Sequence, residues 1–504
     1  MEPAQSLNIA ERFLDARIAE GDGDRVALKT TGGDFTYAQV HDLASRYATV
    51  LRDRGVRQEQ RVIIALPDGA DFVGAFFGTL KLGAVVVMVN PHQPADAIFD
   101  VCDRARAQVC VLSAGTLPHG DTPWPARWLE VGHPADDEAL AGASPMTQTV
   151  PTHRDDPAIW LFSGGTTGRP KAVVQSHASF AYTTARYGHE VLGYDRDDVV
   201  LSVPKLYFGY ATGANLLFPF SVGATSVLFS ERCTVDTLFA MIERFSPTIL
   251  INVPTMVNHM VNAPEAPDMA SLRLSTSAGE ALSPTLHGRW RERFGVPLVD
   301  GLGTAEMWHI FLSNRPDKVQ PGTLGWPVPG FEIELRDPEG RPVSQGEVGR
   351  MWVKGGARAI GYWQNAEADR EAFVGPWYAS QDMLCQNADG SFTYCGRGDD
   401  MLKVSGRWVS PREVEDSLLR HPMVKEAAVV GVADAAGLVK PWAFILPAEG
   451  LPAHEAEAAK ALQDHVKSDL EPYKYPRQVR FMADLPRTHL GKVSRGALKK
   501  MAHG

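Results

Sequence analysis

Cysteine is scarce in this chain. Five cysteines occur among 504 residues: Cys102, Cys110, Cys233, Cys385 and Cys395. None of them forms a CxxC pair or lies beside a histidine cluster, which is the spacing of zinc and dithiol redox motifs. An odd and sparse set is also unlike the disulfide framework of a secreted domain. We therefore expect reduced thiols and no cysteine-based metal site.

The chain also lacks a long apolar segment. Its longest apolar runs, residues 62–66 and 84–89, are far shorter than the roughly 20 residues of a membrane-spanning helix. The first residues, Met-Glu-Pro-Ala-Gln, do not have the basic and then apolar layout of a signal peptide. We expect a soluble, cytoplasmic protein with no membrane partner.

Positive charge is not in excess. The chain has 50 Lys and Arg against 60 Asp and Glu, a formal net charge of −10, and no dense basic run. This balance argues against a nucleic-acid partner and favours small molecules. A chain of 504 residues exceeds what one hydrophobic core normally supports, so we expect at least two domains and a size that suits an enzyme. The sequence gives no indication of the oligomeric state.

The hydrophobic pattern predicts an α/β fold. Residues 61–66 and 84–89 have the character of strands, and residues 71–82 between them have apolar positions at helical spacing. Such a unit is a parallel βαβ crossover. Further apolar strands are predicted at residues 199–203, 225–229, 248–253, 272–275 and 297–299. Covered parallel sheets are therefore expected, with ligands at the carboxyl ends of the strands.

The C-terminal part is expected to be a separate, smaller α+β domain. Short strands with Pro-Gly and Glu-Gly turns over residues 321–352 predict a β-rich subdomain of the large N-terminal domain. Residues 397–400 form a polar linker, and Ser410-Pro-Arg-Glu413 has the pattern of a helix capping box. We predict domains at residues 1–396 and 401–504 with a hinge between them. The predicted C-terminal elements are helices at 411–420 and 454–470 and strands at 424–432, 441–446 and 478–482.

A glycine-rich loop carries the first functional signal. The segment Ser163-Gly-Gly-Thr-Thr-Gly-Arg-Pro-Lys171 directly follows the apolar run 159–162. Glycines allow the backbone to approach a ligand closely, hydroxyls donate to phosphate oxygens, and a lysine adds a compact cation. The loop differs from a Walker P-loop, because Arg169 and Pro170 separate the last glycine from the lysine. A surface turn has a similar composition, but the position after a buried strand favours phosphate binding.

The loop closely resembles the signature loop of the adenylate-forming (ANL) superfamily, which includes acyl-CoA and aryl-CoA synthetases. The resemblance continues through Asp300-Gly-Leu-Gly-Thr-Ala-Glu306, Gly396-Arg-Gly-Asp-Asp400 and Pro486-Arg-Thr-His-Leu-Gly-Lys492, in the order of the family. Over nearly the whole chain, including residues 205–212, 252–257, 276–280 and 303–310, the sequence is similar to benzoate-CoA ligases. This resemblance implies an acid–thiol ligase that uses ATP, Mg²⁺ and coenzyme A.

The resemblance also implies a site for ATP and AMP. The implied binding residues are Ser163, Thr166, Thr167, Lys171, Gly279, Glu280, Ala281, Asp300, Gly301, Leu302, Asp382 and Arg397. Thr304 is implied at the α-phosphate, and Glu306 as the ligand of Mg²⁺, which favours a carboxylate with water and phosphate oxygens. Asp382 and Arg397 are implied at the ribose. Here the chain departs from the family, because Gln381 replaces the glycine that usually precedes the aspartate.

Lys492 is the implied catalytic residue, since the lysine of the last motif bridges the acid and the phosphate in this family. The resemblance further implies two orientations of the C-terminal domain, with Asp399 as the pivot. One presents Lys492 for adenylation, and the other presents the 403–406 loop for thioester formation. Ser405, Gly406 and Lys474 are the candidate contacts of coenzyme A.

The residues between the motifs predict a short pocket for one aromatic ring. The candidate lining residues are Gly209, Tyr210, Ser277, Ala278, Gly303, His309 and Ile310. His309 could instead be a core histidine with its hydrogen bonds satisfied. Gly209 removes a methyl group beside the ring, so the pocket is predicted to admit an ortho substituent, and anthranilate (2-aminobenzoate) is a candidate beside benzoate.

Two alternatives stay open. The acceptor of the acyl group could be the phosphopantetheine arm of a carrier protein, as in a stand-alone adenylation enzyme. The chain could also be a catalytically silent nucleotide-binding regulator. The presence of Lys171, Glu306, Asp382, Arg397 and Lys492 argues against the second alternative.

Overall fold

The structure is a computed structural model of the 504-residue chain. It describes residues 5–116, 127–163, 170–398, 401–404, 407–434, 438–487 and 493–503. Contacts divide the chain into two compact units. The first comprises residues 1–332 and 353–378, and the second comprises residues 333–352 and 379–504.

The first unit contains a nine-stranded sheet in which six neighbouring strands are parallel. Strands β13, β12, β11, β9, β10 and β1 run parallel, and β2, β14 and β15 are antiparallel at the two edges. The order is β15 (Trp326–Pro327), β14 (Ile310–Ser313), β13 (Leu298–Gly303), β12 (Leu274–Ser277), β11 (Ile249–Asn252), β9 (Val199–Ser202), β10 (Thr225–Leu228), β1 (Val26–Thr30) and β2 (Gly33–Thr36). The five strands predicted between residues 199 and 299 are therefore confirmed.

A seven-stranded sheet in the same unit contains the predicted βαβ crossover. Its order is β18 (Gly361–Tyr362), β8 (Lys171–Ser176), β7 (Pro157–Ser163), β4 (Val85–Met88), β3 (Arg61–Ala65), β5 (Val109–Ser113) and β6 (Arg127–Val131). Strands β7, β4, β3, β5 and β6 are parallel, whereas β8 and β18 are antiparallel. The helix between β3 and β4 is α3 (Ala70–Lys81), as the sequence predicts.

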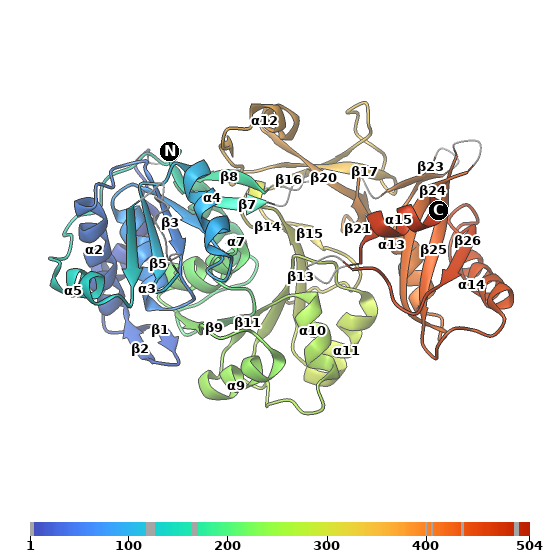
Figure 1. Ribbon diagram of the computed structural model, residues 1–504, viewed down its shortest axis with the longest axis horizontal. Coiled ribbons are helices and arrows are strands. Elements are labelled where there is room, and N and C mark those ends of the chain that lie inside the picture. The colour runs from blue at the N-terminus through green and yellow to red at the C-terminus, as the bar shows by residue number, and fades with distance from the viewer. Residues whose placement is uncertain are drawn as a thin grey trace. The chain divides into compact units, whose positions relative to one another are not determined.

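Helices cover both sheets. The helices of the first unit are α1 (Ala16–Ala19), α2 (Tyr37–Asp53), α3, α4 (Ala95–Ala105), α5 (Pro134–Gly142), α6 (His177–Thr183), α7 (Gly209–Thr212), α8 (Phe218–Val222), α9 (Val235–Phe245), α10 (Pro254–Asn262), α11 (Pro284–Phe294) and α12 (Ala366–Ala372). Helices α9, α10 and α11 are labelled in Figure 1. Their apolar side chains pack against the nine-stranded sheet, and those of α4 pack on the seven-stranded sheet. Three π-helical segments, Glu11–Asp15, Thr184–His189 and Gly213–Leu217, adjoin α1, α6 and α7.

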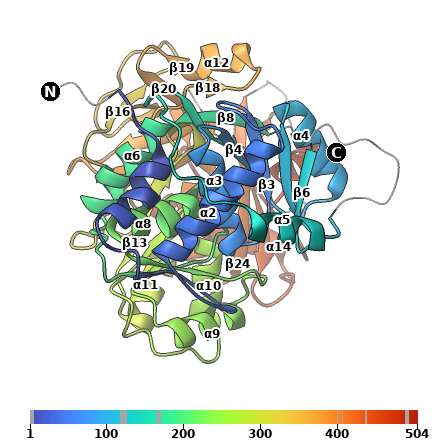
Figure 2. The same cartoon turned by 90° about the vertical axis from the view of Figure 1, so that its left-hand side faces the viewer.

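Helices α2 and α3 lie side by side in both views (Figures 1 and 2) because α3 presents glycines to α2. A Cβ atom at Gly78 would lie 2.7 Å from the main-chain oxygen of Ala44, so only glycine permits this approach. Helix α2 begins at a capping box in which Thr36 and Gln39 satisfy each other's backbone N–H groups.

The second unit contains the predicted C-terminal elements. A three-stranded sheet has the order β24 (Val424–Ala433), β25 (Val439–Pro447) and β26 (Gln478–Phe481), with α13 (Pro411–Leu419) and α14 (Glu455–Asp469) packed on one face (Figure 1). Helix α15 (Arg495–His503), which the sequence analysis did not predict, packs on the other face. A short hairpin of β22 (Leu402–Val404) and β23 (Arg407–Val409) joins the α13 side of this core.

The contacts do not follow the domain boundary expected at residues 397–400. Residues 333–352 and 379–396, which we assigned to the N-terminal domain, have their contacts with the C-terminal residues. They contain most of strands β16 (Glu332–Arg336), β17 (Val348–Lys354), β20 (Trp377–Gln386) and β21 (Phe392–Arg397). Strand β21 is tied to the start of α13, because the Ser410 hydroxyl donates to the main-chain oxygen of Cys395. The hinge at Asp399 lies outside the described residues and stays a prediction.

Candidate active site

The glycine-rich loop begins and ends at one point of the seven-stranded sheet. Strands β7 and β8 form an antiparallel pair in which Ser163 and Lys171 are direct neighbours. This places the hydroxyl residue and the lysine at the two ends of the same loop. Thr166 and Thr167, the other predicted phosphate contacts, lie outside the described residues.

Glu306 lies in a 3₁₀ turn at the end of the nine-stranded sheet. The turn (Ala305–Met307) follows β13 directly, and Glu306 is almost fully buried. Its Oε1 atom accepts a hydrogen bond of 2.8 Å from the hydroxyl of Tyr362. The side chain of Gln175, on β8, donates to the main-chain oxygen of Ala305 at 2.7 Å. The first bond connects the turn with strand β18, and the second connects it with β8, the strand that follows the glycine-rich loop.

The residues around this turn show one unusual backbone conformation and one buried hydroxyl without a hydrogen-bond partner among the described residues. Trp308, just after the turn, has φ of 60°, which is uncommon for a residue with a bulky side chain. The hydroxyl of Thr304 is buried and has no hydrogen-bond partner among the described residues. A buried hydroxyl without a partner costs about 1–3 kcal/mol, which a ligand oxygen would recover. Both features fit a site that is completed by a ligand.

The implied ATP-binding residues at 300–302 lie within a strand. Asp300, Gly301 and Leu302 belong to strand β13, and Gly301 pairs with Ser313 of the antiparallel strand β14. A Cβ atom at Gly301 would lie 2.9 Å from Cγ2 of Ile310 and from the main-chain oxygen of Leu312. The glycine is therefore needed for close packing between strands, and not for a turn.

The implied ATP-binding residues Gly279, Glu280 and Ala281 follow strand β12. Gly279 has φ of 85°, a left-handed conformation that favours glycine. The next residue, Glu280, accepts a hydrogen bond of 2.6 Å from the hydroxyl of Thr255, at the start of α10. Ala281 completes this turn, which leads to helix α11.

The ring-pocket residues converge on Tyr210 and His309. The Nε2–H group of His309 donates to the main-chain oxygen of Tyr210 at 3.0 Å, and the two ring centroids are 5.3 Å apart. The hydroxyl of Tyr210 shares a hydrogen bond of 2.6 Å with Thr276 Oγ1 on strand β12. Ser277 and Ala278, which follow Thr276, are also buried. Residues of strand β12, of helix α7 and of the segment just before β14 thus contact one another.

His309 is neutral in this setting. Burial lowers the pKa of His309 to about 4, although the hydrogen bond to the Tyr210 carbonyl acts in the opposite direction. With Nε2 protonated, Nδ1 is an acceptor, and it has no partner among the described residues. Only one of the two ring nitrogens of His309 therefore has a hydrogen-bond partner among the described residues. This favours a role in a ligand pocket over that of a core histidine with both hydrogen bonds made.

Two glycines that border His309 leave no space for a side chain. A Cβ atom at Gly213 would lie 2.4 Å from His309 Cδ2, and one at Gly303 would lie 2.4 Å from the His309 main-chain oxygen. Ile310, the first residue of β14, is buried next to them. The sequence analysis missed Gly213, since a glycine inside a helical segment gives no signal of a contact with a distant histidine.

The predicted role of Gly209 requires a correction. A Cβ atom at this position would lie 3.1 Å from both Cδ atoms of Leu161, on strand β7, so the methyl group would face this leucine. Leu161 is itself buried. The absence of a side chain at position 209 therefore leaves room for the side chain of Leu161. A substitution at Gly209 would act on a bound ring by displacing Leu161.

The second unit holds the predicted ribose residues. Asp382 and Arg397 are cross-strand neighbours on β20 and β21, with Arg397 Nη1 3.9 Å from Asp382 Oδ1. Two residues that the sequence analysis missed also contact the carboxylate. The hydroxyls of Ser380 and Tyr394 donate to Asp382 at 2.5 and 3.2 Å.

Gln381 fits this arrangement without a strained backbone. It lies within strand β20, its side chain is exposed, and its main-chain oxygen accepts from the N–H group of Gly398 at 2.7 Å. Its φ is not positive, so glycine is not required here. The departure from the family pattern therefore leaves Asp382 in place.

Lys474 has carboxylate partners within its own unit. Its Nζ atom lies 2.6 Å from Glu413 and 2.6 Å from Glu471. Burial alone would lower the pKa of Lys474, but the two carboxylates outweigh it and raise this pKa. An anionic ligand would have to compete with both. The other predicted residues of this part, Ser405, Gly406, Asp399 and Lys492, lie outside the described residues.

Comparison with known families agrees with these motifs. Residues 15–363 match the family described as "AMP-binding enzyme", and residues 413–492 match "AMP-binding enzyme C-terminal domain". The chain belongs to the AMP-binding enzyme family.

Three relatives of this AMP-binding enzyme act on aromatic acids. The benzoate–CoA ligase of Thauera aromatica is 39% identical over 98% of this chain and 96% of its own length. The crystal structure of a benzoate CoA ligase from Burkholderia xenovorans has 38% identity and a TM-score of 0.86, and covers 98% of this chain and 99% of that one. The crystal structure of the anthranilate CoA ligase AuaEII in complex with anthranoyl-AMP has 34% identity and a TM-score of 0.88. It covers 99% of this chain and 98% of that one.

These likenesses confirm the predicted superfamily, the α/β fold and the class of acid–thiol ligase. In the described part of the AMP-binding enzyme, no helix is long and apolar enough to cross a membrane.

Proposed function

We propose that this AMP-binding enzyme is an ATP-dependent aryl-CoA ligase. It activates benzoate or 2-aminobenzoate as an acyl-adenylate and transfers the acyl group to coenzyme A, with release of AMP and pyrophosphate. The relatives named above, which ligate benzoate and anthranilate to CoA, support this assignment.

One observation carries the proposal. Strands β12 and β13 are parallel neighbours, with Ser277 opposite Asp300, so their carboxyl ends lie together. The first strand ends at the ring pocket beside Tyr210, and the second leads to Thr304 and Glu306. An acid bound by its ring in the pocket would thus present its carboxylate near the residues for phosphate and metal. Such placement at strand ends is the usual location of ligands in α/β sheets.

The pocket suits an uncharged ring. His309 is neutral at pH 7, because its pKa is about 4. Burial also raises the pKa of Tyr210 well above its usual value, so its hydroxyl stays protonated. The pocket therefore places polar hydrogen-bonding groups, but no charge from these two residues, around the ring, and leaves the acid's carboxylate to the phosphate end of the site.

The residues fit Mg²⁺ as an ion held chiefly by the nucleotide. No group of three or more His, Cys, Asp or Glu in the described residues could hold a metal ion alone. Glu306 offers a single buried carboxylate, so the remaining ligands of Mg²⁺ would be phosphate oxygens and water. When bound, the ion neutralises phosphate charge as pyrophosphate leaves.

The reaction follows as two substitutions. An oxygen of the acid forms a bond to the α-phosphorus while the bond to pyrophosphate breaks. The sulfur of CoA then bonds to the acyl carbon and releases its proton to solvent, while the bond from that carbon to the bridging oxygen breaks, so that AMP leaves with an oxygen that came from the acid. Lys171 and Lys492 would balance negative charge in the first step, and the 403–406 loop would serve the second. The roles of Lys492, Ser405 and Gly406 rest on the sequence motifs alone.

Mass spectrometry of reaction products tests the proposal. Purified protein is incubated with ATP, Mg²⁺ and CoA, and separately with benzoate, anthranilate, salicylate, 4-hydroxybenzoate, phenylacetate or octanoate. Benzoyl-CoA or anthraniloyl-CoA together with AMP is the expected product. An acyl-adenylate that is not transferred to CoA would indicate a carrier-protein acceptor, and no product with any acid would contradict the proposal.

A further inference from the structure

We propose that Tyr362 is a positioning residue that holds the two opposite charges of the phosphate site, Lys171 and Glu306, apart and ready for Mg²⁺ and ATP. The inference rests on the proposed function, because it takes Lys171 and Glu306 to be the residues for phosphate and metal.

A single side chain contacts both charged groups. The ammonium of Lys171 lies 5.0 Å from the centroid of the Tyr362 ring, and the hydroxyl of Tyr362 donates to Glu306 Oε1 at 2.8 Å. In the part of the chain that the structure describes, Lys171 and Glu306 form no ion pair with each other. The tyrosine contacts the cation through its ring and the carboxylate through its hydroxyl, and it satisfies each of them in part.

This arrangement prevents a competing interaction. A lysine and a glutamate near each other in a partly buried site attract strongly, and a direct pair would occupy the groups that ATP and Mg²⁺ need. A contact with a ring face holds an ammonium more weakly than a carboxylate would, so phosphate oxygens can replace it. The single hydrogen bond to Glu306 leaves its second oxygen without a described partner, available to a metal ion.

The position of Tyr362 is fixed from several sides. Its N–H group donates to Asp369 Oδ1 at 2.6 Å, and β18 pairs with β8 so that Tyr362 is opposite Val173. The ring of Phe373 packs against it with centroids 5.2 Å apart. The side chain is therefore placed before any ligand binds.

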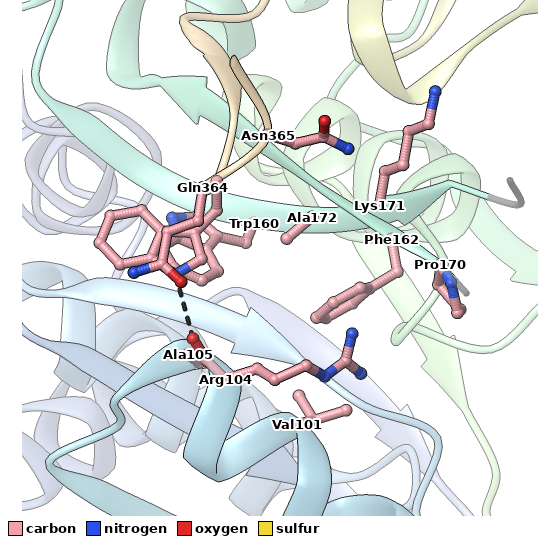
Figure 3. Close-up of a pocket in the computed structure, with 11 residues that line it drawn as sticks. Val101, Arg104, Ala105, Trp160, Phe162, Pro170, Lys171, Ala172, Gln364 and Asn365 are labelled. Carbon is pink, nitrogen blue, oxygen red and sulfur yellow. Dashed lines mark hydrogen bonds between the residues drawn. The ribbon is translucent and has the colours of Figure 1, made fainter. Parts of the chain in front are cut away.

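The next residue anchors the same segment to the sheet. The indole N–H of Trp363 donates to the main-chain oxygen of Arg104 at 3.0 Å, and its ring lies 4.8 Å from that of Trp160 on β7. The pocket shown in Figure 3 lies at this point, between the end of α4, strands β7 and β8, and residues 363–365. Lys171 lies on its rim, next to the segment that carries Tyr362. Residues 363–365, which follow Tyr362, and strand β8, which begins at Lys171, thus line the same pocket.

Two substitutions separate the two contacts of the tyrosine. Tyr362→Phe keeps the ring under Lys171 and removes only the hydroxyl. We expect the free Mg²⁺ concentration for half-maximal activity to rise about tenfold, since hydrogen bonds to charged groups are among the stronger ones. Tyr362→Leu also removes the ring face, so the KM for ATP should rise by roughly a further three- to tenfold. The KM for the aromatic acid should stay unchanged in both.

Tyr47→Phe is the matched control. The hydroxyl of Tyr47 donates to Asp71 Oδ1 at 2.9 Å in the same unit, outside the site. This variant should leave the Mg²⁺ dependence and the KM for ATP at wild-type values. If Tyr362→Phe changed only the melting temperature, or raised the KM for ATP and acid equally, Tyr362 would be a structural residue and the inference would be overturned.

Metal-free ATP binding, measured by calorimetry, tests the separation of charge directly. Tyr362→Leu should weaken this binding because Lys171 would pair with Glu306. Adding Glu306→Gln to Tyr362→Leu should restore it, since the competing carboxylate is then neutral. No recovery in the double variant would overturn the inference. Binding does not depend on turnover, so a wild-type protein that binds ATP but ligates no acid would refute the proposed function alone.

Discussion

The ring of His309 packs directly on the backbone of Gly213, so that a methyl group at position 213 would lie 2.4 Å from its Cδ2 atom. Such a distance is well inside van der Waals contact, and the histidine is further held by its hydrogen bond to the Tyr210 carbonyl. The glycine therefore determines where His309 lies, and with it one wall of the proposed ring pocket.

Gly213→Ala should displace His309 and disturb the pocket. Overpacking of this kind costs about 1–3 kcal/mol, and we expect a lower melting temperature and a higher KM for the aromatic acid, with an unchanged KM for ATP. Gly288→Ala is the control, because this glycine lies within α11 with nothing within 4 Å of a Cβ atom. That change should stabilise the protein by about 0.5–1 kcal/mol. An acid KM unchanged by Gly213→Ala would contradict the placement of His309 in the pocket.

Acid should destabilise the fold through His309. Its pKa is about 4 in the folded protein, below the usual value of 6.5, so the unfolded chain binds its proton more readily. The stability associated with neutral His309 is complete above pH 6.5 and is lost as the pH falls towards 4. A pKa shift of this size changes the free energy of unfolding by on the order of 3 kcal/mol between neutral pH and a pH below 4. Melting temperatures from pH 7.5 to 4.5 should fall less steeply for His309→Gln than for the wild type, and parallel curves would refute this.

Gly209 should control ring substituents through Leu161. In Gly209→Ala the new methyl group pushes on Leu161, and we expect a greater loss of kcat/KM with anthranilate than with benzoate. A methyl-sized contact is worth about 1–3 kcal/mol in selectivity. Leu161→Val in the same chain should recover part of the loss by giving the methyl group room. An equal loss of kcat/KM with anthranilate and with benzoate would contradict the prediction that Gly209 allows an ortho substituent.

Tyr394 should contribute to ATP binding through Asp382. Burial raises the pKa of Tyr394, as does the nearby carboxylate of Asp382, so its hydroxyl remains a donor to that carboxylate. Tyr394→Phe should raise the KM for ATP about three- to tenfold, the usual effect of one hydrogen bond. With 2′,3′-dideoxy-ATP the variant and the wild type should differ little. The same penalty with both nucleotides would mean that Tyr394 does not act through the ribose.

Lys492 and Asp399 should affect opposite half-reactions. Lys492→Ala removes the positive charge needed as the acid attacks phosphorus, so acyl-adenylate formation should fall, whereas transfer from a supplied acyl-adenylate to CoA should persist. Asp399→Pro, at the expected pivot, should do the reverse. Exchange of pyrophosphate into ATP measures the first half-reaction, and thioester formation from synthetic adenylate measures the second. Wild-type adenylation by Lys492→Ala would show that its assigned role is wrong.

Elements with a strong periodic pattern could be predicted from the sequence. The βαβ crossover over residues 61–89 and five strands of the nine-stranded sheet (β9 to β13) lie where the apolar runs place them, because buried parallel strands need continuous apolar segments. Strands β1, β2, β14 and β15 of that sheet were not predicted. The packing role of Gly301 and Gly303 could not be predicted in the same way. The motif names both residues, but only the fold shows that they allow β14 to lie close to β13.

The chemical motifs identified the main candidate residues but not the residues that position them. Tyr362 is 56 positions from Glu306, and no local spacing connects the two. Tyr394 and Ser380 are nearer to Asp382, yet a tyrosine and a serine in strands have many possible reasons to be there. These contacts depend on how strands pair, which a single sequence without the fold does not specify.

The contacts of Gly213 and Gly303 with His309 also define where ring specificity can be changed by engineering. Both positions are closed to any larger residue unless the histidine moves, so a side chain there should act on the proposed pocket chiefly by displacing His309. Leu161, Gly209 and Ala278 are the positions at which we expect changes to act on the proposed ring site without such a clash with His309, provided that a side chain at Gly209 is matched by a smaller one at Leu161. A search for variants that accept bulkier acids should begin with combinations of these three.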